Sequence, residues 1–163
     1  MSRYFKYKSS ARLAEDASRM GLAIGLQADP SPLLEPFDLD GRTVGNRLAV
    51  QPMEGCDADL DGKPSPLTLR RFERFGGGGA KLIWGEACAV VPEGRANPRQ
   101  LLINEANASS LEAILRASRD AHRRQCGDDA DLIVGLQLTH SGRYSFARPI
   151  RAQHDPLLDP RTV

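Results

Sequence analysis

The sequence contains little of what several classes of protein require. Only three cysteines, Cys56, Cys88 and Cys126, occur in 163 residues. Their odd number and wide spacing argue against a disulfide framework and against a zinc or iron–sulfur site, so we expect reduced thiols and no bound metal. No apolar stretch approaches the roughly 20 residues that a membrane-spanning helix needs, which predicts no membrane partner.

A strong excess of charge of either sign is also missing. The formal net charge is +1, from 22 basic and 21 acidic side chains. A nucleic acid or an anionic membrane surface is usually matched by an excess of basic residues, so this balance predicts neither as a partner. The first residues lack the apolar segment of a secretory signal peptide, and the expected location is therefore the cytoplasm.

What the sequence does contain is three short apolar runs that each end in polar or small residues. They span residues 48–54 (LAVQPME), 81–87 (KLIWGEA) and 132–140 (LIVGLQLTH). Helical patterns over residues 67–75 and 107–125 separate them. This β-α-β-α-β order predicts parallel strands with crossover helices, and the almost continuous apolar runs predict burial on both sheet faces.

Smaller elements are predicted before these runs. Residues 9–20 have the pattern of a short helix that Ser9 or Ser10 would cap. Prolines interrupt the segment that follows, so we interpret residues 1–32 as an N-terminal extension and residues 33–163 as the main domain. The dipeptide Asp40-Gly41 lies between two short alternating runs and predicts a β-hairpin with a type I′ turn.

Two features of the main helices lead to further expectations. Four glycines, at positions 76–79, follow a helix and precede a strand, whereas a phosphate-binding loop follows a strand and opens a helix. The glycines therefore favour a helix end over a phosphate cradle. In the second main helix, Ser109 or Ser110 is the expected cap, and His122 is expected to lie on a solvated polar face.

The carboxyl ends of parallel strands are where sheets and barrels of this kind place their chemistry. Here those ends carry Glu54, Glu86, Gln137 and His140. A glutamine in an apolar strand is costly to bury unless its amide is paired, so Gln137 indicates a binding site. We expect Glu86 to be a structural carboxylate at its strand end.

Three segments resemble the old yellow enzyme family of NADH:flavin oxidoreductases. Residues 45–53 (GNRLAVQPM) are similar to the first barrel strand of that family, and residues 75–87 (FGGGGAKLIWGEA), followed by 90–95 (VVPEGR), to the second. Residues 137–143 (QLTHSGR) are similar to the third. The segments occur in the family's order and at its spacing, and the resemblance covers roughly residues 33–150.

The resemblance implies a TIM (β/α)8 barrel that holds FMN at its C-terminal mouth and accepts hydride from NAD(P)H. Such a barrel needs about 250 residues. The chain would then be an α/β protein that forms a partial TIM barrel, with the first three β/α units preceded by a short N-terminal helix and a β-hairpin. The family's substrate-binding histidine pair, proton donor and phosphate site would lie beyond residue 163, so no catalytic residue is assigned here.

Flavin-binding positions also follow from the resemblance. Pro52, Met53 and Glu54 would contact the flavin edge at the end of the first strand. Ala87 would leave room for the pyrimidine edge of the flavin, and Gln137 would pair its amide with ring atoms. His140 and Arg143, in the loop after the third strand, would shape the site or contact the substrate.

Glu54 departs from the family pattern, which usually has Thr or Cys at this position. An ionised carboxylate accepts hydrogen bonds and disfavours an anionic reduced flavin, and it would donate only if burial raised its pKa. The alternative is a loop carboxylate turned to solvent.

The function that the resemblance implies is hydride transfer from NAD(P)H through FMN to an activated alkene, such as an enone or an enoyl thioester, by a full-length parent. The chain alone is expected to be inactive. Two alternatives stay open. One is a structural or assembly piece whose strand edges pair with another copy or with the missing half of the barrel. The other is an unrelated phosphate-binding barrel, against which the glycine run argues.

Overall fold

The chain divides into two units, residues 1–32 and residues 33–163, and the computed structural model describes residues 7–147. The first unit contains helix α1 (Ser10–Arg19). The Ser9 side chain accepts a hydrogen bond from the backbone N–H of Arg12, as an N-terminal cap does. The predicted short helix and its cap are therefore confirmed. A 3-10 turn, η1 (Ser31–Leu33), follows at the boundary between the units.

The second unit opens with an antiparallel hairpin of β1 (Phe37–Leu39) and β2 (Arg42–Val44). Asp40 and Gly41 connect the strands with φ angles of 52° and 79°. Two positive φ angles are what a type I′ turn requires, and the Asp38 carboxylate accepts a hydrogen bond from the Gly41 N–H. The predicted hairpin is confirmed.

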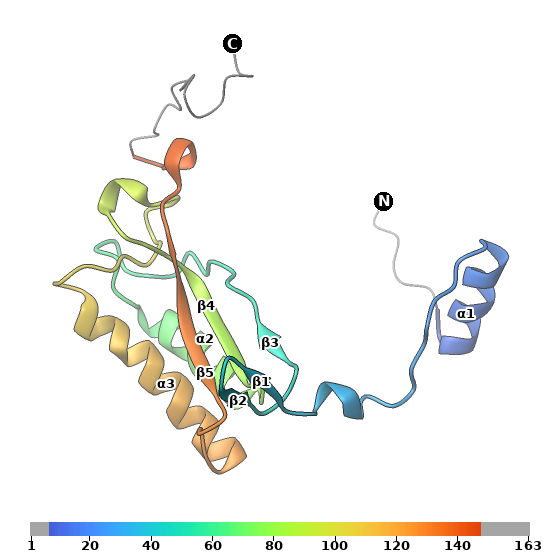
Figure 1. The fold of residues 1–163 in the computed structure, drawn as a ribbon. Helices are drawn as coiled ribbons and strands as arrows, with labels where there is room; N and C mark the ends of the chain where they lie inside the picture. Colours follow the sequence, from blue (N-terminus) through green and yellow to red (C-terminus); the bar gives the residue numbers. More distant parts are fainter. Residues whose placement is uncertain (1–6, 148–163) are drawn as a thin grey trace. The chain divides into compact units, whose positions relative to one another are not determined.

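The main sheet has three parallel strands in the order β3-β4-β5 (Figure 1). Strand β3 (Ala49–Val50) leads through a loop to helix α2 (Pro66–Gly77), and β4 (Leu82–Ala89) leads through η2 (Pro92–Gly94) to helix α3 (Ala108–Cys126). Strand β5 (Ile133–Thr139) precedes a last turn, η3 (Gly142–Tyr144). The predicted α/β class and partial barrel sheet are confirmed, with three parallel strands and two crossover helices within residues 7–147.

Strand β3 is shorter than its apolar run predicts. The run continues to Glu54, but the chain leaves the sheet after Val50. Pro52 has no N–H to give to a strand ladder, and this accounts for the early end of pairing. Residues 51–65 therefore form a long loop beyond the carboxyl end of β3, next to the equivalent end of β4.

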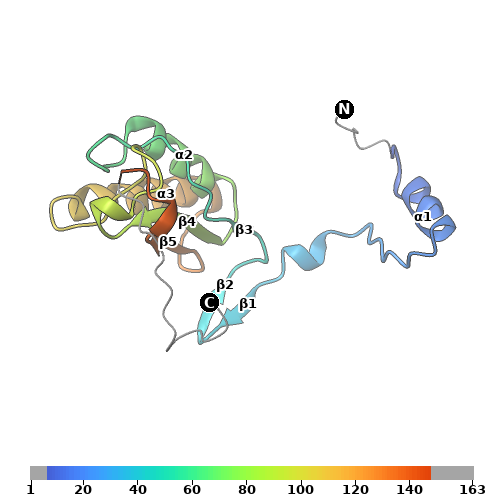
Figure 2. The same cartoon turned by 90° about the horizontal axis from the view of Figure 1, so that it is seen from above.

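Helices α2 and α3 cover one face of this sheet (Figure 1 and Figure 2). Phe72 from α2, Ile114 from α3 and Ile83 from β4 meet in the same buried cluster. The helices approach so closely at Gly76 that an added Cβ there would lie 2.0 Å from the carbonyl oxygen of Ser118. Helix α2 continues through Gly77 and ends at Gly78, which confirms the glycine run as a helix end rather than a phosphate cradle.

Two expectations about α3 are wrong. His122 is fully buried, with Nδ1 2.8 Å from the Gly76 carbonyl oxygen, because the close approach of α2 covers a helix face that its sequence marks as polar. The helix begins after Asn107 rather than at a serine cap. The Asn107 amide instead donates to the carbonyl oxygens of Asp61 and Leu102, so it joins two loops. Nowhere within residues 7–147 is there a helix long and apolar enough to cross a membrane.

Candidate functional site

The exits of β3, β4 and β5 lie at one edge of the sheet because the strands are parallel (Figure 1). The strand register places Ala87 of β4 opposite Gln137 of β5, beyond a register shift at Gly85. Ala87 is buried and small, whereas the Gln137 side chain is exposed. The structure therefore brings two predicted site residues side by side, with a free amide next to a position where the backbone can be approached closely.

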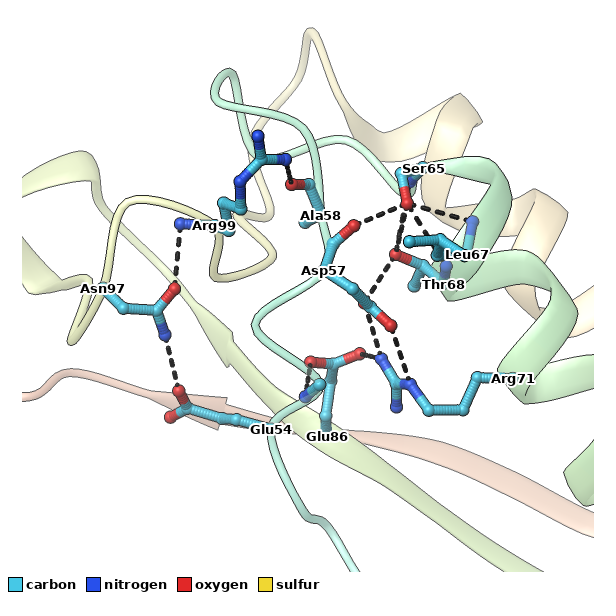
Figure 3. Close-up of polar contacts among 11 residues, drawn as sticks. Glu54, Asp57, Ala58, Ser65, Leu67, Thr68, Arg71, Glu86, Asn97 and Arg99 are labelled. Atoms are coloured by element: carbon cyan, nitrogen blue, oxygen red, sulfur yellow. Dashed lines mark hydrogen bonds and ion pairs between the residues drawn. The ribbon is translucent and has the colours of Figure 1, made fainter.

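Glu54 is held over this edge by two amides from the loop that follows β4. Asn97 Nδ2 donates to Oε2 at 2.9 Å (Figure 3), and Gln100 Nε2 donates to Oε1 at 3.3 Å. The side chain is half-buried, so it is not a carboxylate turned wholly to solvent. Burial and the negative charge of Glu86 raise the pKa of Glu54, while the bond from Asn97 opposes that rise.

Gln100 connects Glu54 to the end of β4. Its side chain is fully buried, and Nε2 also donates to the carbonyl oxygen of Ala87 at 3.1 Å. Its Oε1 accepts from the Ala96 N–H at 2.6 Å, so both ends of the amide are used. Sequence reasoning missed this residue, since a single glutamine in an irregular loop has no periodicity or motif of its own to mark it.

A partly buried ion-pair network fixes the loop that carries Glu54. Arg71 of α2 makes two hydrogen bonds to Asp57, of 3.0 and 2.9 Å, and also pairs with Glu86 (Figure 3). Glu86, 2% exposed, accepts a hydrogen bond of 3.0 Å from the Gly55 N–H. This matches the structural role expected for Glu86, since its carboxylate ties the loop to β4 and α2.

Asp57 links the same network to the start of α2. The Thr68 hydroxyl donates to its carboxylate at 2.8 Å, within the Ser65 capping box that begins the helix (Figure 3). Burial opposes ionisation of Asp57, but the hydrogen bonds from Arg71 and Thr68 outweigh it and lower its pKa. The loop is thus locked to the helix by a carboxylate that stays ionised.

The exits of β4 and β5 are joined by backbone hydrogen bonds. The Ser141 N–H donates to the Gly94 carbonyl at 2.8 Å, and the Phe146 N–H donates to the Arg95 carbonyl at 3.0 Å. An added Cβ on Gly94 would lie 2.8 Å from the ring of His140, so only glycine lets these loops approach so closely. The buried Arg95 side chain then reaches the carbonyls of Leu60 and Pro98, which makes it a second connecting residue.

The remaining predicted residues are more exposed. His140 Nδ1 accepts a hydrogen bond from the Gly142 N–H at 2.9 Å. Arg143 donates to the hydroxyl of its neighbour Tyr144 and stacks over that ring at 4.9 Å. Met53 is 75% exposed, and Pro52 is half-buried. In the described part of the chain, no three His, Cys, Asp or Glu side chains gather as a metal site would require.

Comparison with known proteins adds to this geometry. No protein-family model matches the chain. The chain is 32% identical over 112 residues to an NADPH dehydrogenase of Bacillus pumilus, and 29% identical over 113 residues to one of Bacillus licheniformis. Each alignment includes 68% of this chain and 31% of the relative. The chain therefore spans about a third of the length of the curated relatives it matches.

Solved structures of old yellow enzymes share the fold of this chain over about a third of their own length. An old yellow enzyme homologue from Zymomonas mobilis superposes with a TM-score of 0.58 at 25% identity, over 72% of this chain and 32% of that one. The old yellow enzyme from Trypanosoma cruzi gives 0.57 at 26% identity, over 78% and 33%. A 2-naphthoyl-CoA reductase in complex with 2-naphthoyl-CoA gives 0.62 at 17% identity, over 72% and 17%, and supports the fold alone.

Proposed function

Since this chain is related to the old yellow enzymes in both sequence and fold, we propose that it is the N-terminal part of an FMN-dependent NAD(P)H oxidoreductase. The complete enzyme would pass hydride from NAD(P)H to an activated alkene in the cytoplasm, and the bound flavin would supply the hydride chemistry. The observation that carries this proposal is the meeting of Glu54, Ala87 and Gln137 at one sheet edge.

The residues at this edge fit an isoalloxazine ring. Its pyrimidine portion presents alternating donors and acceptors, which an exposed amide such as that of Gln137 can match with one side chain. Ala87 supports close approach because its side chain ends at Cβ. Met53, the neighbour of Glu54 in the chain, offers an exposed apolar surface for the flat ring. Pro52, Met53, Glu54, Ala87 and Gln137 would therefore orient the flavin, and His140 and Arg143 would border the substrate.

The open side of β5 supports the proposal that a longer barrel completes this fold. In the described residues, β5 pairs only with β4. Leu136 and Leu138 of β5, together with Leu115 of α3, line an apolar groove of about 360 Å³. We propose that the next β/α unit of the complete enzyme covers this groove. Association with another copy is the alternative for the isolated chain.

A single substitution tests the flavin assignment. In the full-length enzyme, Gln137→Leu should weaken FMN binding about tenfold, because one or two hydrogen bonds worth about 1 kcal/mol each are lost. The matched control is Gln125→Leu, which changes an exposed glutamine on α3 away from the strand exits. Fluorescence titration of FMN measures both affinities. Equal affinity for the wild type and Gln137→Leu would reject the assignment.

A measurement of NAD(P)H oxidation distinguishes the full-length enzyme from the 163-residue chain. Residues 1–163 alone should not oxidise NAD(P)H, because three strands cannot enclose a flavin together with a nicotinamide. The full-length protein should do so when it is loaded with FMN. Flavin-dependent NAD(P)H oxidation by the pure 163-residue chain would overturn the proposal that catalysis needs the complete barrel.

A further inference from the structure

Glu54 is an acidic side chain whose hydrogen-bond partners are both neutral. Asn97 and Gln100 each give one amide hydrogen, and each amide reaches a different carboxyl oxygen. Gln100 is itself fixed at both ends of its amide, so it cannot turn away. The carboxyl group is thus held in one orientation at the strand exits, and no cation within residues 7–147 pairs with it.

The charged groups around Glu54 do not neutralise the negative charge of its carboxylate. On its own loop lie Cys56, whose thiol pKa is raised by burial and by the negative charge of Glu54, and the ionised Asp57. On β4 lies the buried Glu86, whose charge acts directly on Glu54. The nearby cation, Arg71 of α2, is engaged by Asp57 and Glu86.

A ligand that covers this edge would remove the remaining solvent from Glu54. Desolvation disfavours the charged form of a carboxyl group, and no paired cation offsets it here. The neutral form, in contrast, needs no counter-charge, and its O–H is a donor that the carboxylate lacks. Two amide donors already occupy one lone pair on each oxygen, so the new proton faces the remaining open side.

We propose that Glu54 takes up a proton from solvent when a ligand binds at the strand exits and then donates a hydrogen bond to a carbonyl oxygen of that ligand. This inference rests on the proposed function for the location of the ligand. Carbonyl oxygens are present both on the flavin ring and on an enone substrate. The two sources share one chemistry, and separate titrations distinguish them.

The experiment is a measurement of proton uptake by isothermal titration calorimetry. FMN is titrated into full-length apoprotein at pH 7 in buffers of different ionisation enthalpy, and 2-cyclohexenone is titrated into the flavin-loaded protein in the same buffers. The variants are Glu54→Gln and, as a matched control, Glu93→Gln, which changes an exposed glutamate of η2. The FMN phosphate contributes equally to all three proteins, so the difference between them reports the carboxyl group.

The wild type and Glu93→Gln should take up a larger fraction of a proton than Glu54→Gln in one of the two titrations, and that titration identifies the carbonyl. Glutamine at position 54 also donates at every pH. At pH 9, protonation of Glu54 in the wild type costs part of the binding free energy of the ligand. Glu54→Gln should therefore bind the same ligand more tightly than the wild type, up to tenfold for each pH unit above the pKa of Glu54 in the free protein. If Glu54 had only a structural role, its replacement by glutamine would not make ligand binding tighter at pH 9.

The failures are distinguishable. If FMN binds and all three proteins take up protons equally in both titrations, the assignment to Glu54 is wrong while the proposed function survives. If the wild-type full-length protein binds no FMN, the proposed function fails, and the inference fails with it. Weaker binding by Glu54→Gln at every pH, with unchanged proton uptake, would also overturn the inference.

Discussion

Strands β4 and β5 have similar apolar sequences but very different surroundings. Strand β4 lies between β3 and β5, and six of its eight residues are buried. Strand β5 has a neighbour on one side within the described residues, and none of its seven residues is fully buried. The apolar run of β5 is therefore suited to an environment that these residues do not supply, and its exposed side marks where a further β/α unit is expected.

The packing of the two helices that cover the sheet should be most sensitive to a substitution at Gly76. Gly76→Ala should destabilise the fold by about 3 kcal/mol, because its Cβ would meet the backbone carbonyl of Ser118 at 2.0 Å and force α2 and α3 apart. Chemical denaturation measures the change. The neighbouring Gly77→Ala meets no atom within 4 Å and should instead stabilise the helix by about 0.5 kcal/mol. Equal effects at the two positions would contradict the close helix packing.

The ion-pair network beneath the site should have a smaller, pH-dependent effect. Arg71→Met should cost about 2 kcal/mol at pH 7, since it leaves Asp57 and Glu86 without their cation. The pKa of Asp57 is lowered by folding, so its contribution is complete above its unfolded pKa of about 4 and is lost as the pH falls through the folded value. The difference from wild type should accordingly shrink below pH 4.

Arg116→Met is the control for that measurement. Arg116 pairs with Glu112 on the exposed face of α3, and both side chains are 60% exposed. Such a pair contributes a few tenths of a kcal/mol at most. Denaturation curves at pH 7 and pH 3 that show the same loss for both arginine variants would rule out the network as an anchor of the Glu54 loop.

The exposed side of β5 should cause the isolated chain to self-associate. Residues 1–163 expressed alone should self-associate at micromolar concentration, because β5 exposes both an unpaired edge and apolar side chains. Leu138→Lys, at a side chain that is 61% exposed, should weaken this association about tenfold. Leu67→Lys, on an exposed position of α2, should leave it unchanged. Sedimentation that shows a compact monomer of the wild-type chain would contradict the incomplete-barrel interpretation.

Local patterns predicted the elements of this fold well, because their causes are local. The Asp40-Gly41 turn and the helix end at the glycine run depend on backbone conformations that few residues adopt. The burial of His122 was not predictable in this way. It depends on the absence of a side chain at Gly76, 46 residues earlier in the chain, and no periodicity within α3 contains that information.

The candidate site was predictable only in part for the same reason. Parallel strand order alone places Glu54, Ala87 and Gln137 at one edge. The residues that hold Glu54, namely Asn97 and Gln100, come from an irregular loop more than 40 residues away in sequence, and their contacts arise from tertiary structure. Sequence could therefore predict candidate groups at this edge but not the residues that orient them.

The most direct test of the central claim is the visible absorption spectrum of the full-length protein. The full-length protein should purify with, or take up, oxidised FMN, and NADH or NADPH should bleach its absorption under anaerobic conditions. A folded full-length protein that stays colourless after incubation with FMN, and after removal of the excess, would contradict the proposal that these strand exits form a flavin site.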